Sequence, residues 1–555
     1  MIFSYTRRNL SPGLWRLERF LEILPAALSW GLIFSLFFLC LFSPIAGVIA
    51  IVLFDLYWLF RLLYFTIFLV LSYGLLEIER SAPWRRRLED LLNLDCAIGE
   101  TKKRIREAKM DFKTRFSEKR HLAKLKQIKQ KSLRFPQPKE LVHLVLIPFY
   151  SEGISVLQST LEALANADYP LEQIMVVLGV EERAGRSARE LAERLKKEFG
   201  KHFFHFEICV HPEDLPDEAA VKGANATYAA KWAKKFFEDR GIALENVVVS
   251  CFDSDTVASP EYFSCLTYNY LTHPERTRTS FQPIPIYHNN LWDAPSFAQV
   301  LETGSSFMQL IEVTNPETLV TFSSHSMSFK ALDEIGYWPV DLVSDDSAIF
   351  WKAFLFYDGD YRVEPLYVTL SMDVALEDNF WETCQSIYRQ KKRWAWGIEN
   401  FPIFVRGLIA NPKIPLKLKI KQAFRLLEMN VSWAAWTPIM LILSWTPALI
   451  VTREFESSVA HFNAPRVAGV IFDLAMASLV ISIILSLLLL PKRPKPVPLF
   501  EKLLFALQWL LLPLTATLFG SVPALDAQTR LALGRYMEFF VAPKGKRKVA
   551  PKTTS

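Results

Sequence analysis

The stretch VVVSCFDSDT (Val247–Thr256) decides how the central part of this chain is interpreted. Six apolar or small residues lead into Asp253, and Asp255 follows two positions later. Such a run is typical of a buried strand. Two carboxylates at its end suit a hard divalent cation whose remaining ligands are water and substrate phosphates. The alternative is a pair of solvated loop acids, since D-x-D sequences are frequent by chance.

The composition indicates a chain with both membrane and soluble parts. Of its 555 residues, 51% are hydrophobic and 22% are charged, and the net charge is +6. This is too apolar for an ordinary soluble enzyme and too charged for a bare membrane bundle. The six cysteines include no C-x-x-C pair, which argues against a zinc site or a disulfide framework and favours a reducing compartment.

Two long apolar runs near the N-terminus predict a membrane hairpin. The first covers about residues 24–50, and the second continues to residue 76 with only Asp55 and Arg61 as charges. Each run is long enough to cross a hydrocarbon core of about 30 Å. Arginines precede and follow the pair, so both flanks are expected on the cytoplasmic side.

A strongly basic segment follows at about residues 102–134. Apolar residues recur in it at helical spacing, namely Ile105, Ala108, Phe112 and Phe116, and then Leu122, Leu125 and Ile128. One interpretation is a solvated helix with a packing stripe, and the other is attraction to anionic lipid headgroups. Binding of nucleic acid is not expected.

From about residue 140 to 400 the pattern alternates between strands and helices, which predicts a largely parallel α/β sheet. Strands are expected at LVHLVLIPFY, QIMVVLGV, FFHFEICV and residues 247–252, and Ser151 is the expected N-cap of the first helix. Ligands bind beyond the carboxyl ends of such strands. Tyr150, Glu152, Asp253 and Asp255 occupy such ends.

After residue 400 the chain is expected to return to the membrane. A Lys-rich apolar segment at 401–428 predicts an interfacial helix, and spans are predicted at about 430–451, 467–490 and 501–523. Five spans would place the basic tail outside, against the charge rule. The residues Pro513, Gly520 and Pro523 offer one solution, a re-entrant hairpin in the last segment.

Two further motifs carry chemistry. Asp345 and Asp346 precede a helical pattern, where acids serve as caps or dipole partners, or one of them serves as a general base. In QKKRW (Gln390–Trp394), Arg393 offers a planar fork for phosphate oxygens and Trp394 a flat face for a sugar ring. Aromatic and basic residues at a membrane boundary are the alternative.

A D-x-D, an acidic pair about 90 residues later and Q-x-x-R-W about 45 residues further on, flanked by membrane spans, resemble the processive family-2 glycosyltransferases. Cellulose, hyaluronan and chitin synthases belong to that group. The resemblance covers about residues 140–400. It implies an α/β GT-A-type (Rossmann-like) cytoplasmic domain embedded between α-helical transmembrane segments. The expected organisation is a transmembrane hairpin, a basic helical linker, the GT-A domain, an interfacial segment, a second transmembrane region and a basic tail, at residues 1–80, 81–139, 140–400, 401–428, 429–525 and 526–555.

The resemblance also implies roles for individual residues. Asp346 matches the family's general base, and Asp253 and Asp255 would lie at the diphosphate and at Mg²⁺ or Mn²⁺. Further residues match by their motifs PFYSE, KGAN and Q-x-x-R-W. Tyr150 and Glu152 would flank the nucleobase of the donor, and Lys222 would lie near the donor. Gln390 and Arg393 would contact the diphosphate, and Trp394 would contact the acceptor. His325, in FSSHSMSF, is expected to be a structural hydrogen-bonding residue. The chain departs from the family at Gly179, where an acid that reads the nucleobase is usual.

The sequence therefore predicts a membrane-bound inverting hexosyltransferase that uses a nucleotide-diphosphate sugar, processively, to make and export a β-linked polysaccharide. We place it in the plasma (inner) membrane with its catalytic domain in the cytoplasm. The expected partners are the donor, a glycan acceptor and membrane lipids, with an accessory export subunit left open. The alternatives are transfer of a single sugar to a lipid or short acceptor, and a transporter or scaffold whose domain only binds nucleotide. The absence of a G-x-x-x-x-G-K-[ST] loop disfavours an ATP-driven transporter.

Overall fold

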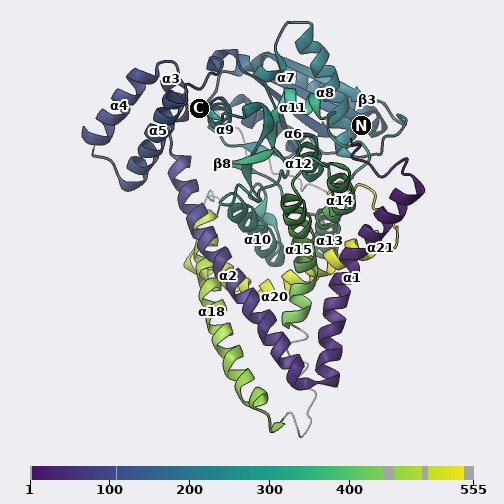
Figure 1. The fold of residues 1–555 in the computed structure, drawn as a ribbon. Coiled ribbons are helices and arrows are strands. Elements are labelled where there is room, and N and C mark those ends of the chain that lie inside the picture. Colours follow the sequence, from purple (N-terminus) through teal and green to yellow (C-terminus); the bar gives the residue numbers. More distant parts are fainter. Residues whose placement is uncertain (1–2, 108, 442–455, 491–497, 543–555) are drawn as a thin grey trace.

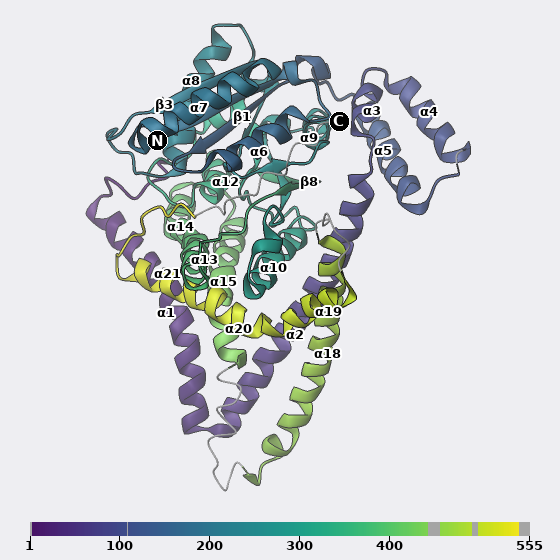
Figure 2. The same cartoon turned by 180° about the vertical axis from the view of Figure 1, so that it is seen from behind.

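The computed structural model describes residues 3–107, 109–441, 456–490 and 498–542. A mixed eight-stranded sheet forms the centre of the large domain, in the order β3-β2-β1-β4-β7-β6-β8-β5. Long helices extend from one side of this domain (Figure 1, Figure 2). The strands are β1 (Val142–Phe149), β2 (Ile174–Glu181), β3 (His205–His211), β4 (Val247–Cys251), β5 (Val257–Ala258), β6 (Thr279–Ile286), β7 (Ser326–Ser328) and β8 (Arg362–Ser371).

The first half of the sheet confirms the predicted parallel α/β pattern. Strands β3, β2, β1 and β4 pair in parallel. Their residues alternate between two cores, so that Leu144 and Leu146 face one side of the sheet while Val145 and Ile147 face the other. Because both of their faces are covered, β1, β2 and β4 consist of largely apolar runs, whereas β3, at the edge of the sheet, is mixed and only partly buried. The parallel arrangement brings the ends of β1 and β4 to the same edge.

The second half of the sheet is mixed. The short β7 pairs antiparallel with both β4 and β6, and β6 pairs in parallel with β8. The loop before β7 thereby lies beside the end of β4, where the two acids of the D-x-D stand.

Helices cover both faces of the sheet. The predicted N-cap of the first helix after β1 is wrong: the N-cap residue is Gly153, not Ser151. One face is covered by α8 (Lys222–Glu238), α11 (Phe329–Glu334) and α12 (Asp345–Phe356), and the other by α6 (Ile154–Ala165), α7 (Gly185–Phe199) and α9 (Tyr262–Thr272). The remaining helices of the domain are α10 (Ser296–Glu312), α13 (Phe380–Ala395) and α14 (Asn400–Ala410).

The predicted basic helical linker, residues 81–139, forms a helical projection beside the domain (Figure 1). It consists of α3 (Trp84–Asp90), α4 (Leu94–Glu107) and α5 (Phe112–Gln130). Leu125 and Ile128 are buried as the predicted packing stripe requires. The earlier part of the stripe is wrong, because Phe112 is 77% exposed and Phe116 is 38% exposed. These two rings stack on each other instead of on the domain.

Among the described residues, four helical runs are long and apolar enough to cross a membrane. Three of them, α1 (Pro12–Phe42), α2 (Pro44–Arg80) and α18 (Val459–Leu489), extend from the same side of the domain in both views (Figure 1, Figure 2). The first two meet at Ser43, next to the proline that begins α2, as the hairpin prediction requires. The four runs indicate a membrane protein.

The fourth run, residues 503–532, is interrupted where the prolines and the glycine predict a break. It comprises α19 (Leu499–Leu507), α20 (Leu512–Ala516) and α21 (Val522–Ala532), joined by a 3₁₀ segment and a π-helical turn at Thr517–Ser521. The predicted re-entrant hairpin is wrong, because these helices follow one another across α1 and α2 (Figure 1, Figure 2).

The predicted segment 401–428 is divided differently in the structure. Helix α14 buries Phe401, Ile403 and Phe404 in the domain core. Helix α15 (Leu416–Leu441) begins within the predicted interfacial segment and continues without a break past residue 428. The composition changes there while the backbone hydrogen bonds continue, so composition alone does not locate a boundary. The rest of the span predicted at 430–451 lies outside the described residues.

Candidate active site

The centre of the candidate site is the ammonium group of Lys222, at the first position of α8. Its Nζ donates to Asp253 Oδ1 at 2.6 Å and to Asp346 Oδ1 at 3.0 Å. Burial alone would lower the pKa of Lys222, but the two carboxylates raise it well above its ordinary value. One cation therefore joins residues that are far apart in the sequence, from α8, from the end of β4 and from the start of α12.

The two acids of the D-x-D differ in their surroundings. The second oxygen of Asp253 accepts from the Ser323 hydroxyl at 2.6 Å, and its side chain is about a quarter exposed. Asp255 is fully buried, and its Oδ2 accepts from the backbone N–H of Asp373 at 2.8 Å. Asp253 thus faces the site, whereas Asp255 is held from behind by the residue that follows β8.

Glu152 holds the D-x-D loop against the end of β1. One carboxylate oxygen accepts from the hydroxyl of Ser254, the residue between the two acids, at 2.9 Å. The other accepts from the backbone N–H of Tyr150 at 2.8 Å and of Ser151 at 3.0 Å. Tyr150 lies under Arg183, whose guanidinium is 4.7 Å from the ring centroid.

The two acids at the start of α12 are not equivalent. Asp345 is 2% exposed, and burial and the charge of Asp346 raise its pKa, an effect that Lys222 and Arg393 oppose. Asp346 is about a quarter exposed and points to Lys222. His325 Nδ1 lies 4.0 Å from Asp346 and 3.1 Å from the Phe322 carbonyl oxygen. Burial lowers the pKa of His325, which agrees with a neutral, structural imidazole.

Helix α13 carries the Q-x-x-R-W residues to the same region. Phe322, next to Ser323, packs its ring edge-to-face on Trp394 with centroids 5.8 Å apart. Arg393 is near enough for its charge to lower the pKa of Asp345. Gln390 is buried one turn before Trp394, and its Oε1 has no hydrogen-bond partner among the described residues. The spatial convergence that the sequence predicts is present.

The segment after α21 returns over α13. The Arg393 guanidinium lies 4.8 Å from the Phe539 ring centroid, and Arg389 lies 5.6 Å from that of Phe540. Ala542 is buried in the cluster that contains Trp394. The sequence predicted only a basic tail here, since a short aromatic segment gives no periodic signal.

Two glycines allow close packing around Lys222. A Cβ at Gly223 would lie 2.5 Å from the Pro339 carbonyl oxygen and 3.0 Å from Asp345 Cβ. A Cβ at Gly179 would lie 2.3 Å from Asn225 Oδ1. Asn225 Nδ2 also donates to the Gly179 carbonyl at 2.9 Å. The space that an acid would occupy at position 179 is therefore filled from α8.

Sequence reasoning missed Asp373 and Ser323. Asp373 stands beside Asp255 and accepts from Asn289 Nδ2 at 2.8 Å. The signal that singled out the D-x-D, an apolar strand ending in an acid, is also present in LYVTLSMD at the end of β8. Ser323 lies in a predicted motif, but its contact with Asp253 depends on the antiparallel β7, which the sequence pattern did not indicate.

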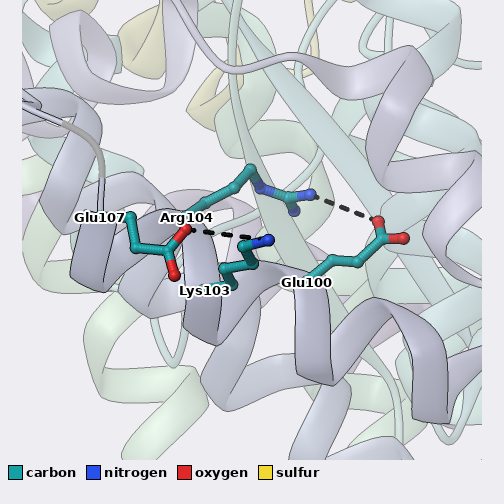
Figure 3. A pocket seen from close by; sticks show the side chains of 4 residues that line it. All are labelled: Glu100, Lys103, Arg104 and Glu107. Atoms are coloured by element: carbon teal, nitrogen blue, oxygen red, sulfur yellow. Dashed lines mark ion pairs between the residues drawn. The ribbon is translucent and has the colours of Figure 1, made fainter.

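A separate surface pocket, on α4, contains none of the predicted site residues. It has a volume of about 440 Å³ and is lined by Glu100, Lys103, Arg104 and Glu107, all on α4 (Figure 3). These residues form two ion pairs along the helix, Arg104 with Glu100 at 3.8 Å and Lys103 with Glu107 at 3.9 Å. Exposed pairs of this kind contribute little free energy and leave no reactive group.

Comparison with known proteins identifies the class. Residues 248–518 match the family model described as "Glycosyl transferase family group 2". Poly-beta-1,6-N-acetyl-D-glucosamine synthase of Staphylococcus epidermidis is 20% identical over 314 residues, which are 56% of this chain and 65% of that protein. The match thus spans somewhat less than two thirds of that relative.

Solved structures with similarity to this chain have low TM-scores. The mannosyltransferase PcManGT from Pyrobaculum calidifontis, in complex with GDP-Man and Mn²⁺, has a TM-score of 0.39 at 15% identity, over 66% of this chain and 94% of that one. S. aureus TarS 1-349 in complex with UDP-GlcNAc has a TM-score of 0.29 at 14% identity, over 61% and 90%.

The sheet and the family match together define a GT-A-type glycosyltransferase domain. Residues 248–518 thus carry a family-2 glycosyltransferase domain, and the described parts of the chain contain four apolar helical runs of membrane-spanning length. The resemblance drawn from its motifs is confirmed.

Proposed function

We propose that this protein is an inverting, processive transferase that adds sugars from a nucleoside diphosphate sugar to a growing β-linked polysaccharide and exports it. The observation that carries the proposal is the bridge from Lys222 to Asp253 and Asp346. It joins the D-x-D, on the proposed donor side, to Asp346, the proposed general base. The similarity to a polysaccharide synthase over half of the chain supports processivity.

The proposed reaction is a single displacement. A hydroxyl of the acceptor gives its proton to Asp346 while its oxygen forms a bond to the anomeric carbon. The bond from that carbon to the diphosphate oxygen breaks, and the nucleoside diphosphate leaves with the electron pair. Asp346 suits this role because its side chain is about a quarter exposed, whereas Asp345 is buried. Arg393 would stabilise the charge of the leaving group.

The charges of the site favour a divalent cation. Asp253, Asp255 and Asp346 carry three negative charges, and Lys222 and Arg393 carry two positive ones. A diphosphate adds at least two more negative charges, which a cation such as Mg²⁺ or Mn²⁺ would balance. Asp253 and Asp255 would hold it together with phosphate oxygens and water, since no group of three or more His, Cys, Asp or Glu side chains of metal-binding geometry occurs in the described parts of the chain.

The other predicted residues receive roles on the same basis. Trp394 would support the acceptor sugar, and Gln390 would contact the diphosphate. Tyr150 and Glu152 would border the nucleobase, although the Glu152 carboxylate already accepts three hydrogen bonds within the protein. Since Asn225 fills the space beside Gly179, the nucleobase would be read by other groups, and no preference for uridine follows.

The proposed location of the catalytic domain rests on the positive charges beside the N-terminal membrane helices. Basic residues flank the N-terminal pair α1 and α2, so the catalytic domain would face the cytoplasm from the plasma (inner) membrane. The spans would then give the product a path outward.

Purified protein offered UDP-glucose, UDP-GlcNAc and GDP-mannose, with and without Mn²⁺, tests the proposal by release of nucleoside diphosphate. A high polymer from labelled donor supports processivity, and a single addition supports the non-processive alternative. Lack of release from every donor, in a sample that binds nucleotide, would favour a nucleotide-binding scaffold.

A further inference from the structure

A buried ion pair lies directly behind the proposed acceptor platform. Lys391, the second residue of the Q-x-x-R-W motif, donates from Nζ to Glu302 Oε2 at 2.7 Å and to the Ser305 hydroxyl at 2.9 Å. The side chains of Lys391 and Glu302 are 3% and 1% exposed. Charged groups are rarely buried this fully, because their desolvation can cost more free energy than the ion pair recovers.

The same ammonium rests on one face of Trp394. Its Nζ is 3.7 Å from the Trp394 ring centroid, a short distance for a cation–π contact. Tyr287 and Phe322 pack around the ring at centroid distances of 5.7 Å and 5.8 Å. One face of the indole is therefore covered by a fixed positive charge, and two aromatic rings pack against the same side chain.

We propose that Glu302 and Lys391 are positioning residues, which fix the plane of Trp394 so that its other face receives the acceptor sugar. The inference deepens the proposed function and rests on it. Neither residue touches the reacting atoms, and both act through Trp394. Without the ammonium the indole would lose its contact on one face and could tilt about its side-chain bonds.

The pair also connects the platform to the membrane side of the protein. Glu302 and Ser305 lie on α10, whose Phe307 stacks on Trp509 with centroids 5.7 Å apart. Leu69 and Leu76 of α2 pack in the same cluster. The proposed acceptor platform is thereby held by a helix that packs against the apolar helices through which the product would leave.

The test separates transfer from hydrolysis of the donor. Water needs no platform, so hydrolysis depends on the donor site alone, whereas transfer depends on Trp394 as well. With whichever of UDP-glucose, UDP-GlcNAc or GDP-mannose the wild type consumes, the ratio of polymer-bound sugar to free sugar is measured. The double variant Glu302→Gln/Lys391→Met removes both charges at similar volume, which avoids leaving one charge buried alone. We expect its transfer-to-hydrolysis ratio to fall about tenfold, with the KM for donor unchanged.

A matched control exists on the same helix. Lys392 pairs with Asp526 at 3.1 Å, on α21, and Lys392→Met/Asp526→Asn should leave the ratio within twofold of the wild type. Introduced into Trp394→Ala, the Glu302→Gln/Lys391→Met pair should cause no additional loss, because the ring through which it acts is absent. If the double variant does not fold, Ser305→Ala, which removes one hydrogen bond of the ammonium but keeps the ion pair, should lower the ratio about threefold.

An unchanged ratio, or an equal loss of transfer and hydrolysis, would overturn the inference while leaving the proposed function intact. A full additional loss in the Trp394→Ala background would do the same. If the wild type released no nucleoside diphosphate from any donor, the proposed function would fail and the inference with it.

Discussion

The two adjacent acids at the start of α12 permit a sharp test of the proposed base. We expect Asp346→Asn to lower the rate of nucleoside diphosphate release at least a hundredfold, equivalent to about 2.7 kcal/mol or more in the activation barrier. The reason is geometric. Asp346 is partly exposed and lies 3.0 Å from Lys222, whose other partner, Asp253, remains in the variant. An amide cannot accept the acceptor proton, but it keeps the shape of the site.

Asp345→Asn is the matched control for that prediction. Burial raises the pKa of Asp345, and Arg393 and Lys222 only partly oppose this, so the protonated form is favoured and asparagine resembles it closely. We expect less than a threefold change in rate. The assay is steady-state release of nucleoside diphosphate at saturating donor, with donor affinity measured separately. Near-normal activity of Asp346→Asn together with a large loss in Asp345→Asn would show that the assignment is reversed.

Three further perturbations address the surroundings of the same site. Lys222→Met should lower the free energy of unfolding by about 2 kcal/mol. The loss is smaller than for a fully buried ion pair, because the carboxylates of Asp253 and Asp346 are about a quarter exposed. Thermal unfolding in detergent measures this loss, and an unchanged melting temperature would contradict it. Gly223→Ala should lower activity at least tenfold, because the new Cβ would lie 2.5 Å from the Pro339 carbonyl oxygen and 3.0 Å from Asp345 Cβ and would displace the start of α12. Gly304→Ala is the control, since no atom lies within 4 Å of the new Cβ and activity should not change. Dialysis against EDTA should abolish nucleotide release and added Mg²⁺ or Mn²⁺ should restore it; activity that survives chelation would exclude the cation proposal.

The parallel half of the sheet could be predicted because its signal is local. Each of β1, β2 and β4 is a short, largely apolar run, because strands buried on both faces require apolar side chains throughout. The edge strand β3 is more polar, but it lies between two helical patterns. The strand β7 has three residues, Ser326–Ser328, two of them serines, so nothing in its composition indicates a strand. It forms because it pairs with β4 and β6, which is a tertiary effect.

Exposure was less predictable than periodicity. Phe112, Phe116, Leu125 and Ile128 all lie at helical spacing, yet only the last two are buried. Spacing states which residues share a face of a helix, but it does not state whether a neighbour covers that face. The same limit applies to α15, where the change from Lys-rich to apolar composition suggested a boundary inside a continuous helix.

Some residues of the candidate site could likewise be predicted from the sequence, and others could not. Asp253, Asp346 and Arg393 could be named from the sequence because each belongs to a motif of unusual composition in a fixed order. Glu302 could not, since a single acid inside a helical pattern is ordinarily read as a solvated face. What distinguishes it is its burial against Lys391, 89 positions later in the chain, and that is a property of the fold. A motif therefore identifies candidate substrate-contacting groups such as Trp394. A residue proposed to position such a group, as Glu302 is, can be identified only from its burial in the folded structure.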